Sequence, residues 1–296
     1  MNKYEEIKRQ IDSLPNDEIE SFVINRLNQL ENETLETTIG QGYTDSYDGY
    51  IGSITHYKPM ASNDKYKCPD LVYDYNQPYI DLINSIKGKN IHILLIMNEI
   101  FHIINNHANL AYSMEFSRGL TYLNAINSNR KLSIKEIFDN DCAFCSERSG
   151  LVQNMLKFLG IDSKLVNGYR DEEPHAYNIV YPNGLGNEPM FLFDSSYFVN
   201  FNSEEKKYSL GYFYGMNQKK YNELISGNKY KIELSKTESF YRSIYGLDDS
   251  FSFEATEPQY IFGLSNNPRI VQDEIEEQWI YNAHFENGIE TNSKEL

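Results

Sequence analysis

The chain has 296 residues, of which 40% are apolar, and it carries a formal net charge of −16 at pH 7. The apolar content is enough to build the core of one large domain or of two modest ones. Because a strongly negative protein repels phosphate backbones and anionic lipids, the charge argues against a nucleic-acid partner and against a membrane-surface role. A neutral or basic partner fits this charge better.

The chain shows no sequence signal for membrane insertion or export. Its longest apolar run, residues 90–104, contains Asn98 and Glu99 and is typical of a buried helix. The first twenty residues carry charges where a signal peptide has its apolar centre, which predicts a cytoplasmic protein. Three cysteines leave at least one thiol unpaired, as expected for a reducing compartment.

The first half of the chain is predicted to be largely helical. Residues 3–32 have apolar residues at helical spacing with a break at Pro15, which predicts two short surface helices. Residues 38–76 are rich in Gly, Tyr, Asp and Ser and show no period, so irregular chain or short strands are expected there. Residues 77–86 and 91–109 predict a short helix and a long buried one.

The middle of the chain predicts a change from helices to strands. Residues 133–140 begin with a capping Ser133 and carry Glu136 three positions later, a pattern that starts helices. An amphipathic helix is predicted from near Cys145 to Gly160, where glycine favours an end. The segments that follow are short, rich in β-branched and aromatic residues and separated by turn residues: "SKLVNGY", "HAYNIVY", "MFLFDSSY" and "YSLGYFYG".

One helix that leads into a run of antiparallel strands is the pattern of an α+β fold. We divide the chain into an N-terminal extension over 1–75, a core over 76–230 and a C-terminal extension over 231–296 that is expected to pack on the core. Residues from about 228 onward match no clear pattern.

The two cysteines of "DCAFCSERSG", Cys142 and Cys145, allow three different chemistries. A zinc site needs two further ligands, but Cys68 stands alone and the histidines are scattered, so no metal is expected. Glu99 and His102 have the spacing of one carboxylate-bundle ligand pair, but a second pair is missing. We therefore interpret His102 and His107 as packing or surface residues.

A dithiol redox pair is the second possibility, because a helix N-terminus lowers the pKa of a thiol. This interpretation predicts that Cys142 begins the helix and that a strand leads directly into it. The apolar spacing begins instead after Cys145, and polar residues precede Cys142. The redox interpretation is less favoured but stays open.

A nucleophilic thiol is the third possibility, and it requires a base together with an acid that orients the base. His175 opens one predicted strand and Asp194 lies near the end of the next. Two neighbouring strands would then present imidazole and carboxylate opposite the helix that carries Cys145. Asn178, three residues after His175, is expected to hold a loop.

The segment from 133 to about 213 resembles the transglutaminase-like cysteine enzymes of bacterial type. The family pattern has a Cys, a small residue four later, Gly-Ile at the helix end and a strand that ends in Gly-Tyr. It continues with "HAYNIV" and an apolar strand into "FDSS". The matching residues are Cys145, Ser149, Gly160, Ile161, Gly168, Tyr169, His175 and Asp194. Departures are Ala143 in place of a usual glycine, and Glu147 and Arg148 in place of the usual aromatic or glycine residues.

The resemblance implies a papain-like core in which Cys145, His175 and Asp194 form a catalytic triad and an acyl-thioester forms on Cys145. It implies a peptide or protein substrate and no cofactor. Tyr112 is in the position of a ring donor to the oxyanion, beside the backbone N–H of Cys145. The role of Cys142 stays open between a small filler and a regulatory disulfide partner.

Hydrolysis by a protease or amidase is the preferred reaction. Transfer of the acyl group to an amine, as in protein cross-linking, is the alternative. A binding module with a vestigial triad is a second alternative function. The presence of all three triad residues argues against it.

Overall fold

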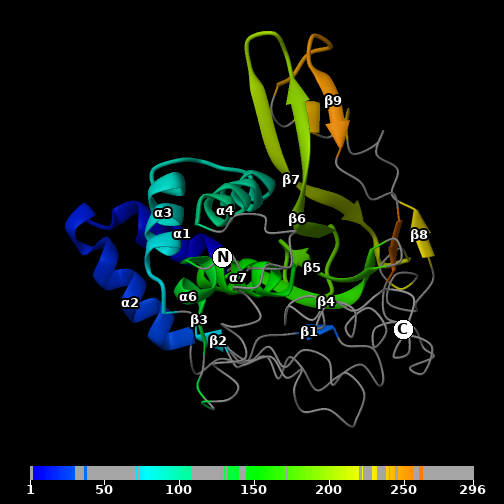
Figure 1. Ribbon diagram of the computed structural model, residues 1–296. Helices are drawn as coiled ribbons and strands as arrows, with labels where there is room; N and C mark the ends of the chain where they lie inside the picture. Colours follow the sequence, from blue (N-terminus) through cyan, green and yellow to red (C-terminus); the bar gives the residue numbers. More distant parts are fainter. Residues whose placement is uncertain are drawn as a thin grey trace.

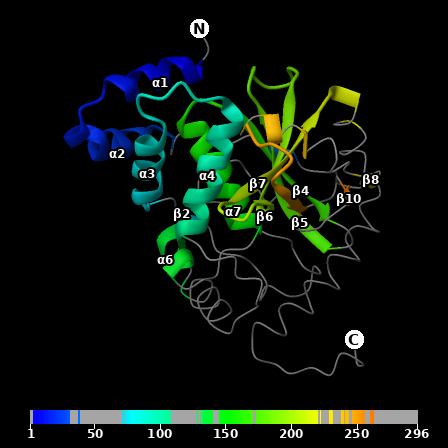
Figure 2. The same ribbon diagram turned by 90° about the horizontal axis from the view of Figure 1, so that it is seen from above.

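The computed structural model describes the backbone of residues 3–30, 37–38, 71–72, 74–107, 128, 130, 132–139, 145–170, 173–219, 222, 229–231, 238–239, 241–243, 246–255 and 260–262. These residues form an α+β fold in which the helices gather on one side of a largely antiparallel sheet (Figures 1 and 2). No helix in these ranges is long and apolar enough to span a membrane.

The N-terminal helices follow the predicted pattern. Helix α1 spans Lys3–Ser13, a short 3-10 turn, η1, spans Asn16–Glu18, and α2 spans Ile19–Leu30. Pro15 lies between α1 and the turn, as its missing N–H and fixed φ favour. The buried residues recur at three or four positions, which confirms two amphipathic helices: Ile7, Ile11, Ile19, Val23, Leu27 and Leu30.

The next two helices form a hairpin in which α4 packs on the sheet. Helix α3 spans Gln77–Ile86 and α4 spans Ile93–His107, and the two pack against each other. Helix α4 also contacts β6 and β7 of the sheet, so it is covered on two sides. This explains its nearly continuous apolar sequence and confirms the predicted long buried helix.

Helix α6, Ile134–Asp139, begins directly after the predicted capping serine. Oγ of Ser133 accepts a hydrogen bond from the backbone N–H of Lys135 at 3.1 Å, which is an N-cap. Glu136 instead binds Arg130 through both carboxylate oxygens, at 2.8 and 2.6 Å. Just before α6, the two-residue strand β3, Leu132–Ser133, pairs in parallel with β2, Leu71–Val72.

Helix α7, Cys145–Phe158, lies at the centre of the fold. It contacts α2 and α4 on one side and the strands β4 (Asp162–Arg170), β5 (Glu173–Tyr181) and β6 (Met190–Asn202) on the other. Its end is a Schellman motif: the N–H of Ile161 bonds to the carbonyl of Leu156, and Gly160 has a positive φ of 76°.

An amphipathic α7 was expected, but polar residues on its other faces are buried as well. Gln153 and Asn154 are 2% and 0% exposed. Gln153 donates to the carbonyl of Ser163 at 3.2 Å, and Asn154 accepts from the hydroxyl of Tyr79. These bonds satisfy the amide of Gln153 and Oδ1 of Asn154, whereas Nδ2 of Asn154 has no hydrogen-bond partner among the described residues.

The sheet is built on four consecutive antiparallel strands in the order β7-β6-β5-β4, with β7 spanning Lys207–Met216. This confirms the predicted run of strands. The distal half of β6 and β7 forms a long hairpin that projects from the sheet, with β9 beside it (Figure 1). The remaining strands of the sheet are short: β1 (Thr37–Thr38), β8 (Lys229–Lys231), β9 (Ser252–Ala255) and β10 (Tyr260–Phe262).

Strands from segments distant in sequence pair with β4 and β6 of this core. Strand β1 pairs in parallel with β4, and β10 pairs with β4 in the antiparallel sense and also binds β8. Strand β9 pairs with the distal part of β6, from Val199 to Asn202. The described residues after 228 therefore include the strands β8, β9 and β10, although the sequence of this segment shows no clear period.

Candidate active site

The three residues expected to form the triad lie on three elements that contact one another. Cys145 is the first residue of α7, His175 is in β5 opposite Gly168, and Asp194 is in β6. Strands β5 and β6 are neighbours, and α7 contacts both. The side chains of Cys145 and His175 lie outside the described part of the structure, as do all of Cys142 and Tyr112.

The ladder between β5 and β6 ends one residue before Asp194. Asn178 pairs with Phe193, and the ladder continues to Val180 opposite Phe191. The ladder ends at Asn178 and Phe193; one further step in the same register would set Tyr177 opposite Asp194 and His175 at the diagonal position. Diagonal neighbours in an antiparallel pair are separated by about 7–8 Å, which long side chains can bridge.

Asp194 is fully buried, at 0% exposure. Its Oδ1 accepts a hydrogen bond from the backbone N–H of Ser196 at 2.9 Å, which is the geometry of an Asx turn. This bond fixes the carboxylate relative to the chain that follows it. A buried carboxylate without hydrogen bonds is energetically unfavourable, so this hydrogen bond lowers the free-energy cost of burying Asp194.

The turn coincides with an irregularity in β6. The β6–β7 ladder passes from Asp194 opposite Tyr212 directly to Phe198 opposite Gly211, so residues 195–197 are additional residues on β6. Such bulges bend a strand and redirect its side chains, and they are frequent next to active sites. The sequence "MFLFDSSY" gave no sign of this break.

Arg148, in the first turn of α7, binds the same turn of β6. Its side chain is only 1% exposed. Nε donates to the carbonyl oxygen of Ser195 at 3.0 Å, and Nη2 donates to the same oxygen and to Oδ1 of Asn105 in α4. The guanidinium thus joins α4, α7 and β6 directly beside Asp194.

Asn178 connects the N-terminal part of α7 to strand β5. Its side chain is fully buried, and Nδ2 donates to the backbone carbonyl of Ser149 at 3.0 Å. The expectation that Asn178 holds a loop is wrong, because its partner is a helix carbonyl. Arg148 and Ser149 therefore connect the start of α7 to β6 and to β5.

A second polar cluster joins α3 and α4. Nδ1 of His107 lies 3.1 Å from the hydroxyl of Tyr75, and its Nε2 lies 2.7 Å from Oδ2 of Asp81. Gln77 donates to the other oxygen of Asp81 at 2.8 Å. His107 is thus a partly buried residue with two polar partners, and it ties the end of α4 to the start of α3.

Burial lowers the pKa of the His102 imidazole, while the negative charge of Glu99 raises it. This is the effect expected of a half-buried histidine on a helix that packs against other elements. Among the described residues, no group of three or more His, Cys, Asp or Glu side chains is arranged to hold a metal ion.

Arg148 and Asn105 were not predicted as site residues. The signal available in the sequence was the pair Glu147 and Arg148, charged residues inside the first turn of a helix that otherwise reads as buried. Both are buried, at 0% and 1% exposure. A charge at such a position indicates a specific partner, but the partner itself, a carbonyl in a distant bulge, cannot be read from the sequence.

Comparisons with protein-family models, with curated proteins and with solved structures find no match to this chain.

Proposed function

We propose that the protein is a cysteine-dependent acyl-transfer enzyme with a papain-like core, which acts on peptide or carboxamide bonds mainly by hydrolysis. Cys145 is the nucleophile, His175 the base and Asp194 the residue that orients the base. The substrate is a neutral or basic peptide or protein, since the chain has a net charge of −16.

One observation carries the proposal: the first turn of α7, which begins at Cys145, is hydrogen-bonded to both strands on which His175 and Asp194 lie. Asn178 makes the bond to β5 and Arg148 the bonds to β6. Two buried polar side chains thus hold together the three elements that an acyl-transfer triad requires.

The position of Cys145 at the start of α7 suits a nucleophile. Free backbone N–H groups and the helix dipole stabilise negative charge at a helix N-terminus, so they favour the thiolate. The backbone N–H of Cys145 is then available as one donor to an oxyanion. A dithiol redox pair predicts a helix that begins at Cys142, whereas α7 begins at Cys145.

The proposed reaction proceeds in two steps. The thiol proton of Cys145 passes to His175, the sulfur bonds to the substrate carbonyl carbon, and the carbon–nitrogen bond breaks as His175 returns the proton to the leaving amine. Water then loses a proton to His175 and attacks the thioester, which releases the carboxylic acid and the thiol. Asp194 orients His175 and stabilises its charged form in both steps.

The test uses probes that do not require the natural substrate. p-Nitrophenyl acetate reports acylation and deacylation, and iodoacetamide reports the thiolate fraction of Cys145 when labelling is followed by peptide mass spectrometry. We expect Cys145→Ser and His175→Gln to abolish turnover and Cys142→Ser to retain it. In the wild type, Cys145 should alkylate at a pH well below about 8.5, the pKa of an ordinary thiol.

Full turnover by Cys145→Ser would refute the proposal, and so would a Cys145 that alkylates like a free cysteine peptide. Loss of activity in both Cys142→Ser and Cys145→Ser would favour the redox interpretation. Incubation of dimethylated casein with a biotinylated primary amine separates the two acyl acceptors: amine incorporation indicates transamidation, and new carboxyl groups indicate hydrolysis.

A further inference from the structure

Arg148 is a charged side chain that is only 1% exposed, and its guanidinium binds both β6 and α4. Its guanidinium gives two hydrogen bonds to a single carbonyl, that of Ser195, and one to Asn105. Burial of a guanidinium is unfavourable because the charge loses its hydration, and apolar residues of similar volume often serve a core equally well. The position therefore calls for a reason beyond packing.

The turn that Arg148 binds, residues 194–196, includes Asp194. Residues 195–197 have no counterpart in the β6–β7 ladder, so ladder hydrogen bonds do not set their conformation. Two side chains bind this turn: Asp194 binds the N–H of Ser196, and Arg148 binds the carbonyl of Ser195. The planar fork of arginine fixes both the distance and the orientation of that carbonyl, which the single ammonium of lysine cannot do.

We infer that Arg148 is a positioning residue of the proposed active site, an inference that rests on the proposed function. It fixes the Asp194 turn against the first turn of α7, and so sets the position of the carboxylate relative to the helix that begins at Cys145. Asn105 orients the guanidinium from α4. Arg148 acts on the reaction through Asp194 and His175 and does not contact the substrate.

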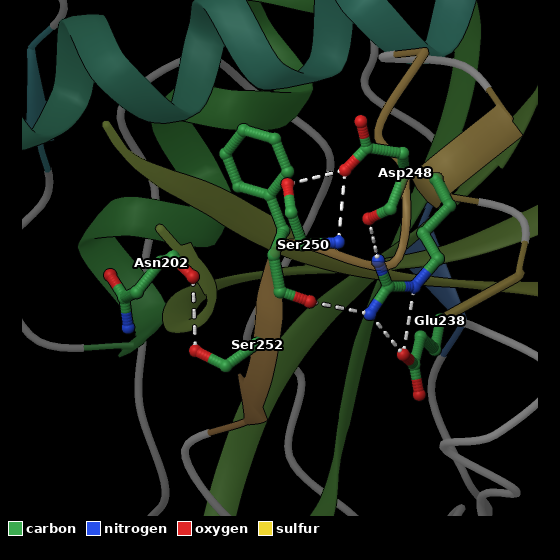
Figure 3. A network of polar contacts seen from close by, with 7 residues as sticks. Asn202, Glu238, Asp248, Ser250 and Ser252 are labelled. Carbon is green, nitrogen blue, oxygen red and sulfur yellow. Dashed lines mark hydrogen bonds and ion pairs between the residues drawn. The ribbon is translucent and has the colours of Figure 1, made fainter. Parts of the chain in front are cut away.

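The chain contains a matched control for this role. Arg242 also binds two backbone carbonyls, those of Asp248 at 2.6 Å and Phe251 at 2.8 Å, and it pairs with Glu238 at 2.7 Å. The contacts of this guanidinium with Glu238 and Asp248 can be followed in Figure 3. Its hydrogen-bond partners Glu238, Asp248 and Phe251 are close in sequence, and its guanidinium also lies 5.4 Å from the ring centroid of Phe201, in the part of β6 beyond the bulge. We therefore expect a change at Arg242 to affect stability without moving the Asp194 turn.

The experiment compares Arg148→Lys with Arg242→Lys in the full chain. Each is measured for urea unfolding, for kcat and KM with p-nitrophenyl acetate per folded molecule, and for the pH dependence of Cys145 alkylation by iodoacetamide. We expect Arg148→Lys to lower kcat by about tenfold or more with little change in KM, and to move alkylation toward the pH profile of an ordinary thiol. Arg242→Lys should leave kcat and the alkylation profile unchanged.

Asn105→Ala keeps the inference testable if Arg148→Lys does not fold, because it removes only the anchor of the guanidinium. We expect it to lower kcat in the same direction by a smaller factor. Wild-type kcat and alkylation profiles in folded Arg148→Lys would overturn the inference while Cys145→Ser and His175→Gln stay inactive, and the proposed function would then stand. Activity that survives Cys145→Ser would overturn both.

Discussion

The side-chain amide of Asn178 lies 3.0 Å from the backbone carbonyl oxygen of Ser149, so strand β5 and the first turn of α7 are joined by a buried hydrogen bond. Asn178 is fully buried, and its Oδ1 has no hydrogen-bond partner in the described part of the structure. At this position the side-chain amide therefore acts only as a donor among the described residues.

Replacement of Asn178 by Asp tests this bond. The change removes the donor and places a second acceptor, charged at neutral pH, against the carbonyl of Ser149. We expect a loss of about 2–4 kcal/mol in the free energy of unfolding, measured by urea denaturation at neutral pH. Asn183→Asp is the control, because the Nδ2 of Asn183 also donates to a carbonyl, that of Glu188 at 3.0 Å, but at the surface. Equal losses in the two variants would contradict the prediction.

Close packing between α4 and β7 predicts different outcomes for two glycines of one strand. A Cβ on Gly211 would lie 2.7 Å from Cε2 of Phe193 and 3.0 Å from Cβ of Phe101, whereas a Cβ on Gly215 meets only Phe191, at 3.8 Å. We expect Gly211→Ala to lower the free energy of unfolding by about 1–3 kcal/mol through overpacking.

Gly215→Ala should leave the free energy of unfolding unchanged or raise it slightly, because alanine loses less backbone entropy than glycine when the strand folds. Thermal unfolding of the two variants side by side measures the difference. A Gly211→Ala protein as stable as Gly215→Ala would show that α4 does not pack as closely on β7 as these distances indicate.

The parts of the fold that could be predicted are those determined by local sequence. Pro15 and Gly160 set helix boundaries through backbone geometry, and Ser133 caps α6 through its own side chain. The alternation of short apolar segments and turns was enough to predict four consecutive strands. In each of these cases the cause lies within a few residues of its effect.

The parts that could not be predicted depend on distant partners. Gln153 and Asn154 occupy positions of α7 that a local pattern assigns to the surface, and their burial depends on Ser163 and Tyr79. The pairing of β9 and β10 with the core likewise joins segments far apart in the sequence. Of the candidate site, the residue types and their order were predictable, whereas the bulge after Asp194 and the arginine that binds it were not.

The end of α7 predicts a second pair of glycine variants. Gly160 and Gly88 both have positive φ, 76° and 70°. A Cβ on Gly160 would lie 2.8 Å from Cδ1 of Ile7 and 3.0 Å from the backbone carbonyl carbon of Lys3, whereas a Cβ on Gly88 meets nothing within 4 Å. We expect Gly88→Ala to lower the free energy of unfolding by about 1–2 kcal/mol, because an L-residue is strained in the left-handed conformation.

Gly160→Ala should cost about 1–3 kcal/mol more than Gly88→Ala, because it must also displace α1. Urea unfolding of both variants gives the comparison, and the excess measures how tightly α1 packs on the end of α7. If the two losses are the same, α1 moves away from the added methyl group without cost.

His102 gives a prediction for the pH dependence of stability. Burial lowers the pKa of its imidazole, and the charge of Glu99 only partly offsets this effect. In the unfolded chain the imidazole titrates near 6.5, so below that pH the unfolded state takes up a proton that the folded state resists. Since stability rises with pH wherever the unfolded state binds more protons, His102 lowers the stability of the folded protein as the pH falls through this window.

The neutral variant His102→Gln removes this proton uptake. We expect the wild type to lose more unfolding free energy than His102→Gln when the pH is lowered from about 7.5 to about 5, while the groups common to both proteins cancel in the comparison. Urea midpoints at the two pH values measure the effect. If the wild type and His102→Gln lose the same amount, the imidazole of His102 titrates in the folded protein as it does in water.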